Sequence, residues 1–200
     1  DDSTDVISRE SLIQSFSLDR IIPSPAVFNQ EKLDWLNGVY IRQLTPSALA
    51  REILPLLESR LPAEVPRPID LEYLLKVIPL EQERMKWLAE VENLTSFFFV
   101  DQPAYDPQEL IPKGFEPGAV SSILAQCLAN LDGAGEWEAS ELELRFRNLA
   151  SELGVKTGDL FGIMRVAVTG RKASPPLFDT MIVLGLERCL SRIRFAESSL

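Results

Sequence analysis

The stretch TPSALAREILPLLESR, residues 45–60, decides the fold class of this chain. Thr45 can cap a helix through its hydroxyl, and Pro46 takes the first helical position, where no needed backbone donor is lost. Pro55 interrupts the pattern, so we expect a kink there. The apolar side chains form one stripe at helical spacing: Leu49, Ile53, Leu56 and Leu57.

Similar helix signals continue on both sides of this stretch. Asn29 can cap a helix through Leu36 that ends near Asn37-Gly38, and Asp70 caps a helix that Pro79 ends. Residues 61–68 hold three prolines and are expected to form a linker. No alternating run is flanked by hairpin turns, so the sequence predicts an all-α fold.

Proline and glycine gather most densely between Asp101 and Pro117, and we expect a domain boundary there. Beyond it the pattern predicts an apolar helix around 120–131, a break at Gly133 and Gly135, and two helices on either side of Gly185. Two caps are expected in between: Ser140 with Glu143 in a capping box, and Thr157 at the start of a helix that Gly170 ends.

Composition limits the chemistry of the chain. Its 200 residues include no histidine, which excludes imidazole relays and His-ligated zinc. Cys127 and Cys189 stand in apolar stretches and are expected to be buried free thiols, which fits a reducing compartment. We find no catalytic constellation, metal site or phosphate loop, and no apolar run long enough to span a membrane. The chain begins at Asp1 without a methionine, so we expect a piece of a longer, soluble protein.

Charge is distributed unevenly. The net charge is −10, which taken whole argues against a nucleic-acid binder. Residues 1–155 carry 13 basic against 26 acidic side chains, whereas residues 156–194 carry 7 against 3, a local net of +4. That segment is either a solvated face beside an acidic body or a site for a polyanion.

A stiff, basic loop lies within this segment. Arg165 stands on a predicted helix, the basic pair Arg171-Lys172 follows it, and the run SPPL, residues 174–177, leads into the next helix. Such a loop can hold its carbonyls and the Ser174 hydroxyl ready for an unstacked base, while Arg165 supplies a forked donor. Ser-Pro-Pro also simply starts helices, so both interpretations stay open. Likewise, the triple Phe at 97–99 is either core or a stacking platform for bases.

Two groups of motifs carry a resemblance to a known family. They are FSLDR (16–20), VFN (27–29) and KLDWLNGVYIR (32–42), then MRVAVTG (164–170), SPPLF (174–178) and VLG (183–185). In this order they resemble bacterial-type glutamyl-tRNA synthetases: the first group resembles the segment after the catalytic domain, the second the terminal anticodon-binding helical domain. The resemblance is collinear over nearly all of the chain.

The resemblance implies a class I ligase that activates glutamate with ATP and Mg and esterifies tRNA(Glu). It implies a cytoplasmic monomer that binds neither DNA nor membrane. The family's HIGH-type and KLSKR-type motifs are missing from these residues, so the chain alone should not aminoacylate or hold a cofactor. It implies the end of a stem-contact region in 1–44 and two helical anticodon-binding domains in 45–115 and 116–200. The alternative is a free-standing helical interaction or adaptor protein derived from such a tail, which the acidic first part suggests.

The resemblance also assigns residues. Arg84 falls on the family's arginine for the third anticodon base, although the register could slip onto Gln82. The residues that match those reading the first two bases are Arg165, Ser174, Pro175 and Leu177. Pro176 stands where some relatives have glycine, which stiffens the loop. We add four basic residues as candidate phosphate contacts: Arg171, Lys172, Arg188 and Arg192. Arg84 favours a protein that accepts tRNA(Glu) and rejects tRNA(Gln), because a guanidinium suits cytosine better than guanine.

Overall fold

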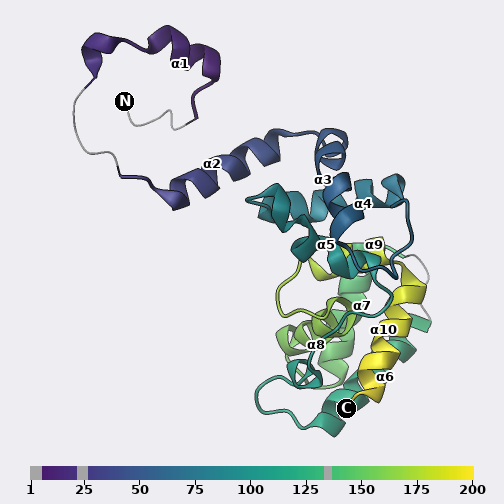
Figure 1. Ribbon diagram of the computed structural model, residues 1–200. Coiled ribbons are helices and arrows are strands. Elements are labelled where there is room, and N and C mark those ends of the chain that lie inside the picture. The colour runs from purple at the N-terminus through teal and green to yellow at the C-terminus, as the bar shows by residue number, and fades with distance from the viewer. Residues whose placement is uncertain (1–5, 22–26, 133–136) are drawn as a thin grey trace.

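The computed structural model describes residues 6–21, 27–132 and 137–200, and all regular structure in these ranges is helical (Figure 1). The predicted all-α fold is confirmed. The chain runs from α1, which stands apart from the body, through α2 and a first group of helices to a second group that ends at the C-terminus. The bounds of the first part are α1 Arg9–Ser15, η1 Leu18–Arg20, α2 Gln30–Gln43, α3 Pro46–Arg60, α4 Leu71–Glu81, η2 Gln82–Arg84, η3 Leu88–Glu90 and α5 Val91–Phe99.

Helix α2 begins where the sequence indicates but ends later. Asn29 caps it by accepting from the Lys32 backbone N–H at 2.9 Å, as predicted. The helix then continues through Gly38, which was expected to end it, as far as Gln43. Its buried face carries on beyond that glycine to Ile41. A Cβ at Gly38 would lie at ordinary contact distance, 3.5 Å, from the Met85 carbonyl oxygen, and 2.9 Å from the Arg42 Nη1, the end of a flexible side chain.

Two helix starts in the first group follow the prediction. Thr45 accepts from the Ala48 backbone N–H at 3.2 Å, and Asp70 accepts from Glu72 at 2.9 Å. Both prolines lie within helices: Pro55 stands inside α3, where a kink was expected, and Pro79 stands inside α4. The prediction that Pro79 ends its helix is wrong: the helix reaches Glu81, since a proline so close to the end removes only one backbone donor from the last turn.

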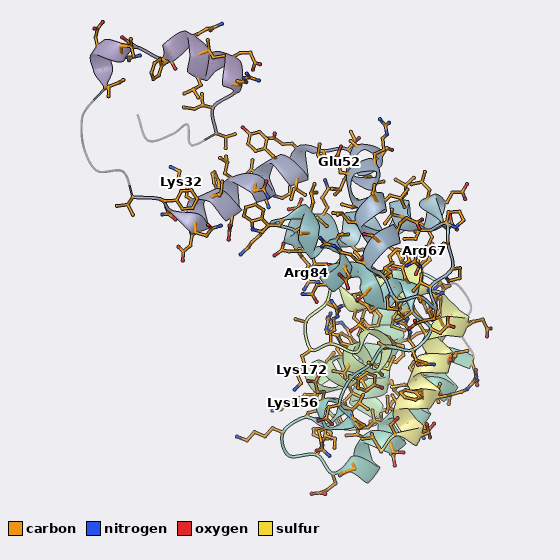
Figure 2. The ribbon with its side chains drawn as sticks, in the orientation of Figure 1. Lys32, Glu52, Arg67, Arg84, Lys156 and Lys172 are labelled. Atoms are coloured by element: carbon orange, nitrogen blue, oxygen red, sulfur yellow. The ribbon has the colours of Figure 1, made fainter. Side chains whose placement is uncertain are left out.

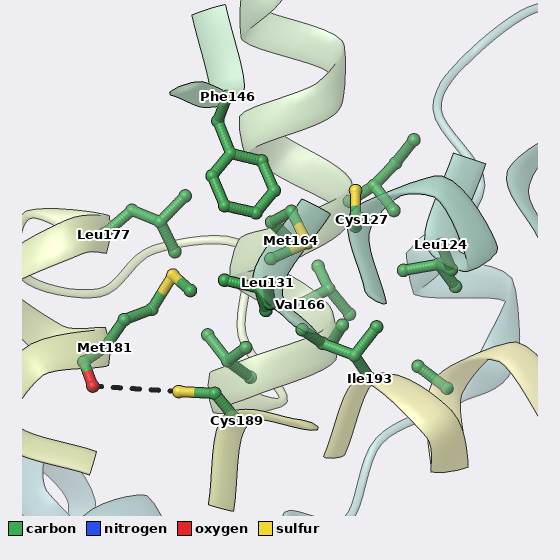
Figure 3. Close-up of a cluster of buried hydrophobic side chains, with 14 of the residues drawn as sticks. Leu124, Cys127, Leu131, Phe146, Met164, Val166, Leu177, Met181, Cys189 and Ile193 are labelled. Carbon is green, nitrogen blue, oxygen red and sulfur yellow. Dashed lines mark hydrogen bonds between the residues drawn. The ribbon is translucent and has the colours of Figure 1, made fainter. Parts of the chain in front are cut away.

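The second group of helices contains most of the chain's buried side chains (Figure 3). Its bounds are η4 Pro107–Leu110, α6 Pro117–Asp132, α7 Ala139–Glu152, α8 Thr157–Thr169, α9 Leu177–Leu184 and α10 Leu186–Ser198. The pair α9 and α10 flanks Gly185 as predicted. Glu138 and Lys156 precede α7 and α8, so Ser140 and Thr157 lie within first turns and the predicted caps are wrong. The expected break at Gly133 and Gly135 lies outside the described residues.

The hydrophobic core divides into two clusters that share helices. Buried side chains of α2, α3 and α4 form the first, and those of α6 to α10 form the second. Helices α4 and α5 contribute to both, since Val77, Phe97 and Phe98 belong to the second cluster. Phe97 and Phe98 are therefore core side chains, not a stacking platform. Both cysteines are free and buried, as predicted.

Two arginines of α10 hold the second group against the end of α5, at a place we call the junction. Arg192 is fully buried and donates to the carbonyl oxygens of Phe97 at 2.7 Å, Val100 at 2.5 Å and Asp101 at 3.0 Å, and to that of Val168 on α8. Burial lowers its pKa to about 10. Arg188 donates to the Phe98 carbonyl oxygen at 2.7 Å and to the Tyr73 hydroxyl at 3.2 Å. The junction thus fixes how the two groups of helices face each other.

Candidate nucleic-acid interface

Arg84 projects from η2, the single turn that directly follows α4. About a third of its side chain is exposed, 35%. Its Nη1 donates to the Glu81 Oε2 at 3.0 Å, and the Glu81 side chain is fully buried. Burial raises the pKa of Glu81 to about 7, which the charges of Arg84 and Arg171 oppose. One guanidinium thus combines a buried anchor with donors that face solvent.

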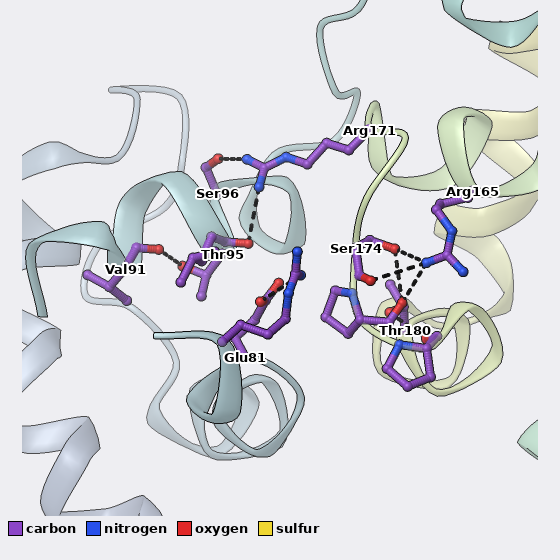
Figure 4. Close-up of polar contacts among 12 residues, drawn as sticks. Glu81, Val91, Thr95, Ser96, Arg165, Arg171, Ser174 and Thr180 are labelled. Atoms are coloured by element: carbon purple, nitrogen blue, oxygen red, sulfur yellow. Dashed lines mark hydrogen bonds and ion pairs between the residues drawn. The ribbon is translucent and has the colours of Figure 1, made fainter. Parts of the chain in front are cut away.

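Arg165 reaches from α8 to the loop before α9. Its Nη1 donates to the Ser174 hydroxyl and carbonyl oxygen, the latter at 3.3 Å, and to the Pro175 carbonyl oxygen at 2.7 Å. Thr180 on α9 donates to the Pro176 carbonyl oxygen at 2.8 Å. The loop is therefore held from both sides, in the stiff form that its two prolines favour (Figure 4).

Arg171 lies between the two groups of helices. Its guanidinium donates to the Ser96 hydroxyl at 3.2 Å and to the Leu94 carbonyl oxygen at 3.4 Å, and lies 5.1 Å from the centre of the Phe97 ring. Gly170 precedes it with a φ of +69°. A Cβ at Gly170 would lie 2.8 Å from the Pro103 Cβ, so this turn requires glycine.

Arg84, Arg165 and Arg171 form one group of charges, which we call the arginine cluster. Burial lowers the pKa of Arg165 and of Arg171, and the charge of Arg84 lowers both further. Arg84 and Arg165, which are 81 residues apart in the sequence, thus lie close enough for their charges to interact. Glu81 lies on one side of the cluster and Ser174 on the other (Figure 4). Arg84, Arg165 and Ser174, which the resemblance assigned to different anticodon bases, thus lie in one region of the structure.

The other predicted site residues differ from one another in how far their side chains are exposed. Pro175 and Leu177 are buried, and Leu177 is 3% exposed, so its side chain offers a base little surface. Lys172 is exposed, and Figure 2 shows it on the same side of the molecule as Arg84 and Lys156. The expectation that Arg192 contacts phosphate is corrected, because its guanidinium is 0% exposed and is used at the junction.

Arg188 and Gln82 also have structural partners. Arg188 is half-buried and caps the end of α5 at the junction, so it too is removed from the candidate phosphate contacts. The Gln82 amide is buried and donates to the carbonyl oxygens of Ile41 at 2.8 Å and Leu44 at 2.9 Å, at the end of α2. The alternative register that placed Gln82 against the third base is therefore unfavourable, whereas Arg84 projects outward.

Three hollows in the described part of the chain adjoin the arginine cluster, and the one beside Arg171, of about 290 Å³, includes Ser96 and Phe97. A second, of about 430 Å³, is lined by Arg165 and includes Arg147, which lies 5.5 Å from the centre of the Phe161 ring. The third, of about 360 Å³, is lined by Arg84 together with Trp35 and Lys86. Sequence reasoning missed Trp35, Arg147 and Phe161, because their helices give no local sign of which face meets the cluster.

The described residues show no group of three or more His, Cys, Asp or Glu side chains placed to hold a metal ion. Among the helices in those ranges, none combines the length and apolar character needed to cross a membrane.

Comparison with known proteins bears on this surface. The model of a family described as an anticodon binding domain matches residues 48–197. A glutamate–tRNA ligase from Roseiflexus castenholzii is 45% identical over 201 residues, covering 100% of this chain and 40% of that protein. One from Dehalococcoides mccartyi strain BAV1 is 43% identical, covering 100% of this chain and 41% of that protein. The chain thus spans about two fifths of the length of these curated relatives.

Solved structures show the same fold. A glutamate tRNA ligase from Elizabethkingia meningosepticum, crystallised with its amino acid, superposes with a TM-score of 0.81 at 24% identity, over 97% of this chain and 37% of that chain. A glutamate-tRNA synthetase from Elizabethkingia anophelis superposes with a TM-score of 0.72 at 25% identity, over 96% of this chain and 36% of that chain.

Proposed function

The chain belongs to the anticodon-binding domain family, and from that premise we propose that it is the tRNA-reading part of a glutamate–tRNA ligase. The observation that carries the proposal is the arginine cluster, where Arg84 of one group of helices meets Arg165 and Ser174 of the other. The match of ligases along the entire chain supports this function over that of a free-standing adaptor.

Base reading would be divided between the two sides of the cluster. Arg84 would donate to the third anticodon base, because its guanidinium is anchored at Glu81 and partly exposed. Arg165, Ser174, Pro175 and the backbone at Leu177 would meet the first two bases. Arg165 already holds the loop before α9 in place, so this loop would lose little conformational freedom when RNA binds. A small loss of conformational freedom favours affinity.

Phosphate contacts would come from exposed cations beside the cluster. Lys172 is exposed on that side, and Arg171 adds charge from a half-buried position. Both belong to the segment with a local net charge of +4, so RNA would be drawn there in spite of the acidic remainder.

The whole protein would attach glutamate to tRNA(Glu) in the cytoplasm, as a monomer, with ATP and Mg. We assign neither ATP nor Mg to any residue of this chain, so these residues would contribute RNA binding rather than the ligase reaction. We further propose that 1–44 end a stem-contact region and that 45–115 and 116–200 are two anticodon-binding domains. Sharing of α4 and α5 between the core clusters would keep those domains in one fixed arrangement.

Fluorescence anisotropy of the chain with a tRNA(Glu) transcript, across a salt series, tests the proposal. Binding should weaken with salt, with a logarithmic slope of about −0.7 to −0.9 per phosphate contact. A transcript that differs only in its anticodon should bind about tenfold more weakly, or weaker still. Equal binding of both transcripts, or no binding at low salt, would overturn the proposed function.

A further inference from the structure

Glu81 is a buried carboxyl group whose hydrogen bonding is incomplete. It is the last residue of α4, and its side chain is 0% exposed. Oε2 accepts from Arg84 at 3.0 Å, whereas Oε1 is buried without a hydrogen-bond partner.

Three features make this position costly for a negative charge. Burial removes the carboxylate from water, and the single partner is a guanidinium that is itself partly exposed. The unpaired Oε1 loses its hydration without replacement. The C-terminal end of a helix also repels an anion, and the last turn of α4 holds no basic residue. A side chain that lowers stability in three ways calls for a role outside stability.

We propose that Glu81 is the positioning residue for Arg84 and thereby determines how sharply the chain distinguishes the third anticodon base. This inference rests on the proposed function and deepens it.

The mechanism follows from the geometry of the pair. An unrestrained arginine samples many rotamers, and ordering it costs free energy when a base binds. A buried acceptor that cannot move fixes one nitrogen of the guanidinium, so the remaining donors have a set direction. The negative charge of Glu81 matters as well as the position of its oxygen atoms. Arg171 and Arg165 repel Arg84, and the Glu81 carboxylate offsets that repulsion.

The test compares Glu81→Gln with Glu83→Gln. Glu83 is a matched control because it lies two residues away and its side chain is 77% exposed. Anisotropy is measured with tRNA(Glu) transcripts carrying cytosine or guanine as the third anticodon base. Wild type and Glu83→Gln should prefer cytosine by about tenfold or more. Glu81→Gln should reduce that preference at least threefold while melting at or above the wild-type temperature at pH 8.

A pH series tests the same inference without a substitution. Burial raises the pKa of Glu81 to about 7, against the opposing charges of Arg84 and Arg171, so Glu81 is the group of this cluster that titrates between pH 5.5 and 8. The wild-type preference should therefore be weaker at pH 5.5 than at pH 8, and that of Glu81→Gln should not change with pH.

The stability of the folded chain should change with pH in the direction opposite to the base preference. The folded chain holds a proton on Glu81 up to about pH 7, whereas the unfolded chain loses it near 4.5. The folded state therefore binds more protons between these values, and stability decreases as pH rises through that window. Glu81→Gln should remove that part of the pH dependence.

The outcomes separate this inference from the proposed function. A wild-type chain that binds both transcripts equally overturns both. A wild-type preference that Glu81→Gln retains within twofold at pH 8, or that stays constant from pH 5.5 to 8, overturns only the role of Glu81. Loss of preference in Glu81→Gln with unchanged melting supports it, since a purely structural residue would lower melting temperature and weaken both transcripts alike.

Discussion

The junction and the arginine cluster use the same side chain in opposite ways. At the junction, Arg192 is fully buried and gives its donors to four backbone carbonyl oxygens. In the cluster, Arg84 has one buried carboxylate as a partner and is 35% exposed. A guanidinium whose donors are used inside the protein holds elements together, whereas one with free donors can meet a ligand. The comparison shows that the environment, not the residue type, assigns the role.

The largest expected effect is a loss of stability caused by a substitution at the junction. Arg192→Met removes donors from four carbonyl oxygens, each costing about 1–3 kcal/mol when buried and unpaired, so unfolding should become easier by about 4 kcal/mol or more. Thermal denaturation followed by circular dichroism should show a melting temperature lower by roughly 10 °C. Arg194→Met is the matched control, because Arg194 lies on the same helix and is exposed. Equal melting of the two variants would contradict a structural role for Arg192.

A smaller and different effect should come from the cluster. Arg84→Gln should lower the melting temperature at pH 8, since it takes the guanidinium partner from the buried Glu81 carboxylate, and should reduce the preference for cytosine over guanine at the third base. A bidentate contact is worth about 1–3 kcal/mol, so the preference should fall by about tenfold to a hundredfold. Competition binding of two tRNA(Glu) transcripts, which differ only in carrying cytosine or guanine as the third anticodon base, measures it, and an unchanged ratio would show that Arg84 does not read the base.

The smallest effect should come from the exposed cation beside the cluster. Lys172→Gln should weaken binding to both transcripts equally and reduce the salt slope by about one, because a phosphate contact carries no sequence information. Titrations at several salt concentrations measure the slope. Lys113→Gln, which removes another exposed lysine, is the control. A change in base preference with Lys172→Gln would contradict the assignment of Lys172 to phosphate contact and of Arg84 to base contact.

Local sequence was informative where a single residue settles a backbone choice. Asn29, Thr45 and Asp70 cap helices as predicted, because a side-chain oxygen next to free backbone N–H groups is a purely local device. Gly38 and Pro79 were misinterpreted: α2 continues through Gly38 to the buried Ile41, and α4 continues past Pro79 to the buried Glu81, so tertiary packing outweighs the local helix penalties of glycine and proline. The same holds for Ser140, which could cap but lies inside α7.

Motifs located part of the candidate site. They indicated Arg84, Arg165 and the loop at Ser174, and the match of residues 48–197 to an anticodon binding domain confirms the resemblance on which this rested. The basic residues of the last segment also suggested Arg188 and Arg192 as phosphate contacts, because a sequence does not reveal that Arg192 is buried and that Arg188 is half-buried against the end of α5.

The sequence by itself determined the all-α class, the family and the position of the basic segment, because helical periodicity, motif order and charge are all properties of neighbouring residues. Only the tertiary structure decided which arginines cap α5 and which are partly exposed, and that Glu81 is buried behind Arg84. Burial and pairing arise between residues far apart in the chain. Their energies depend on a dielectric environment that exists only once the helices have packed.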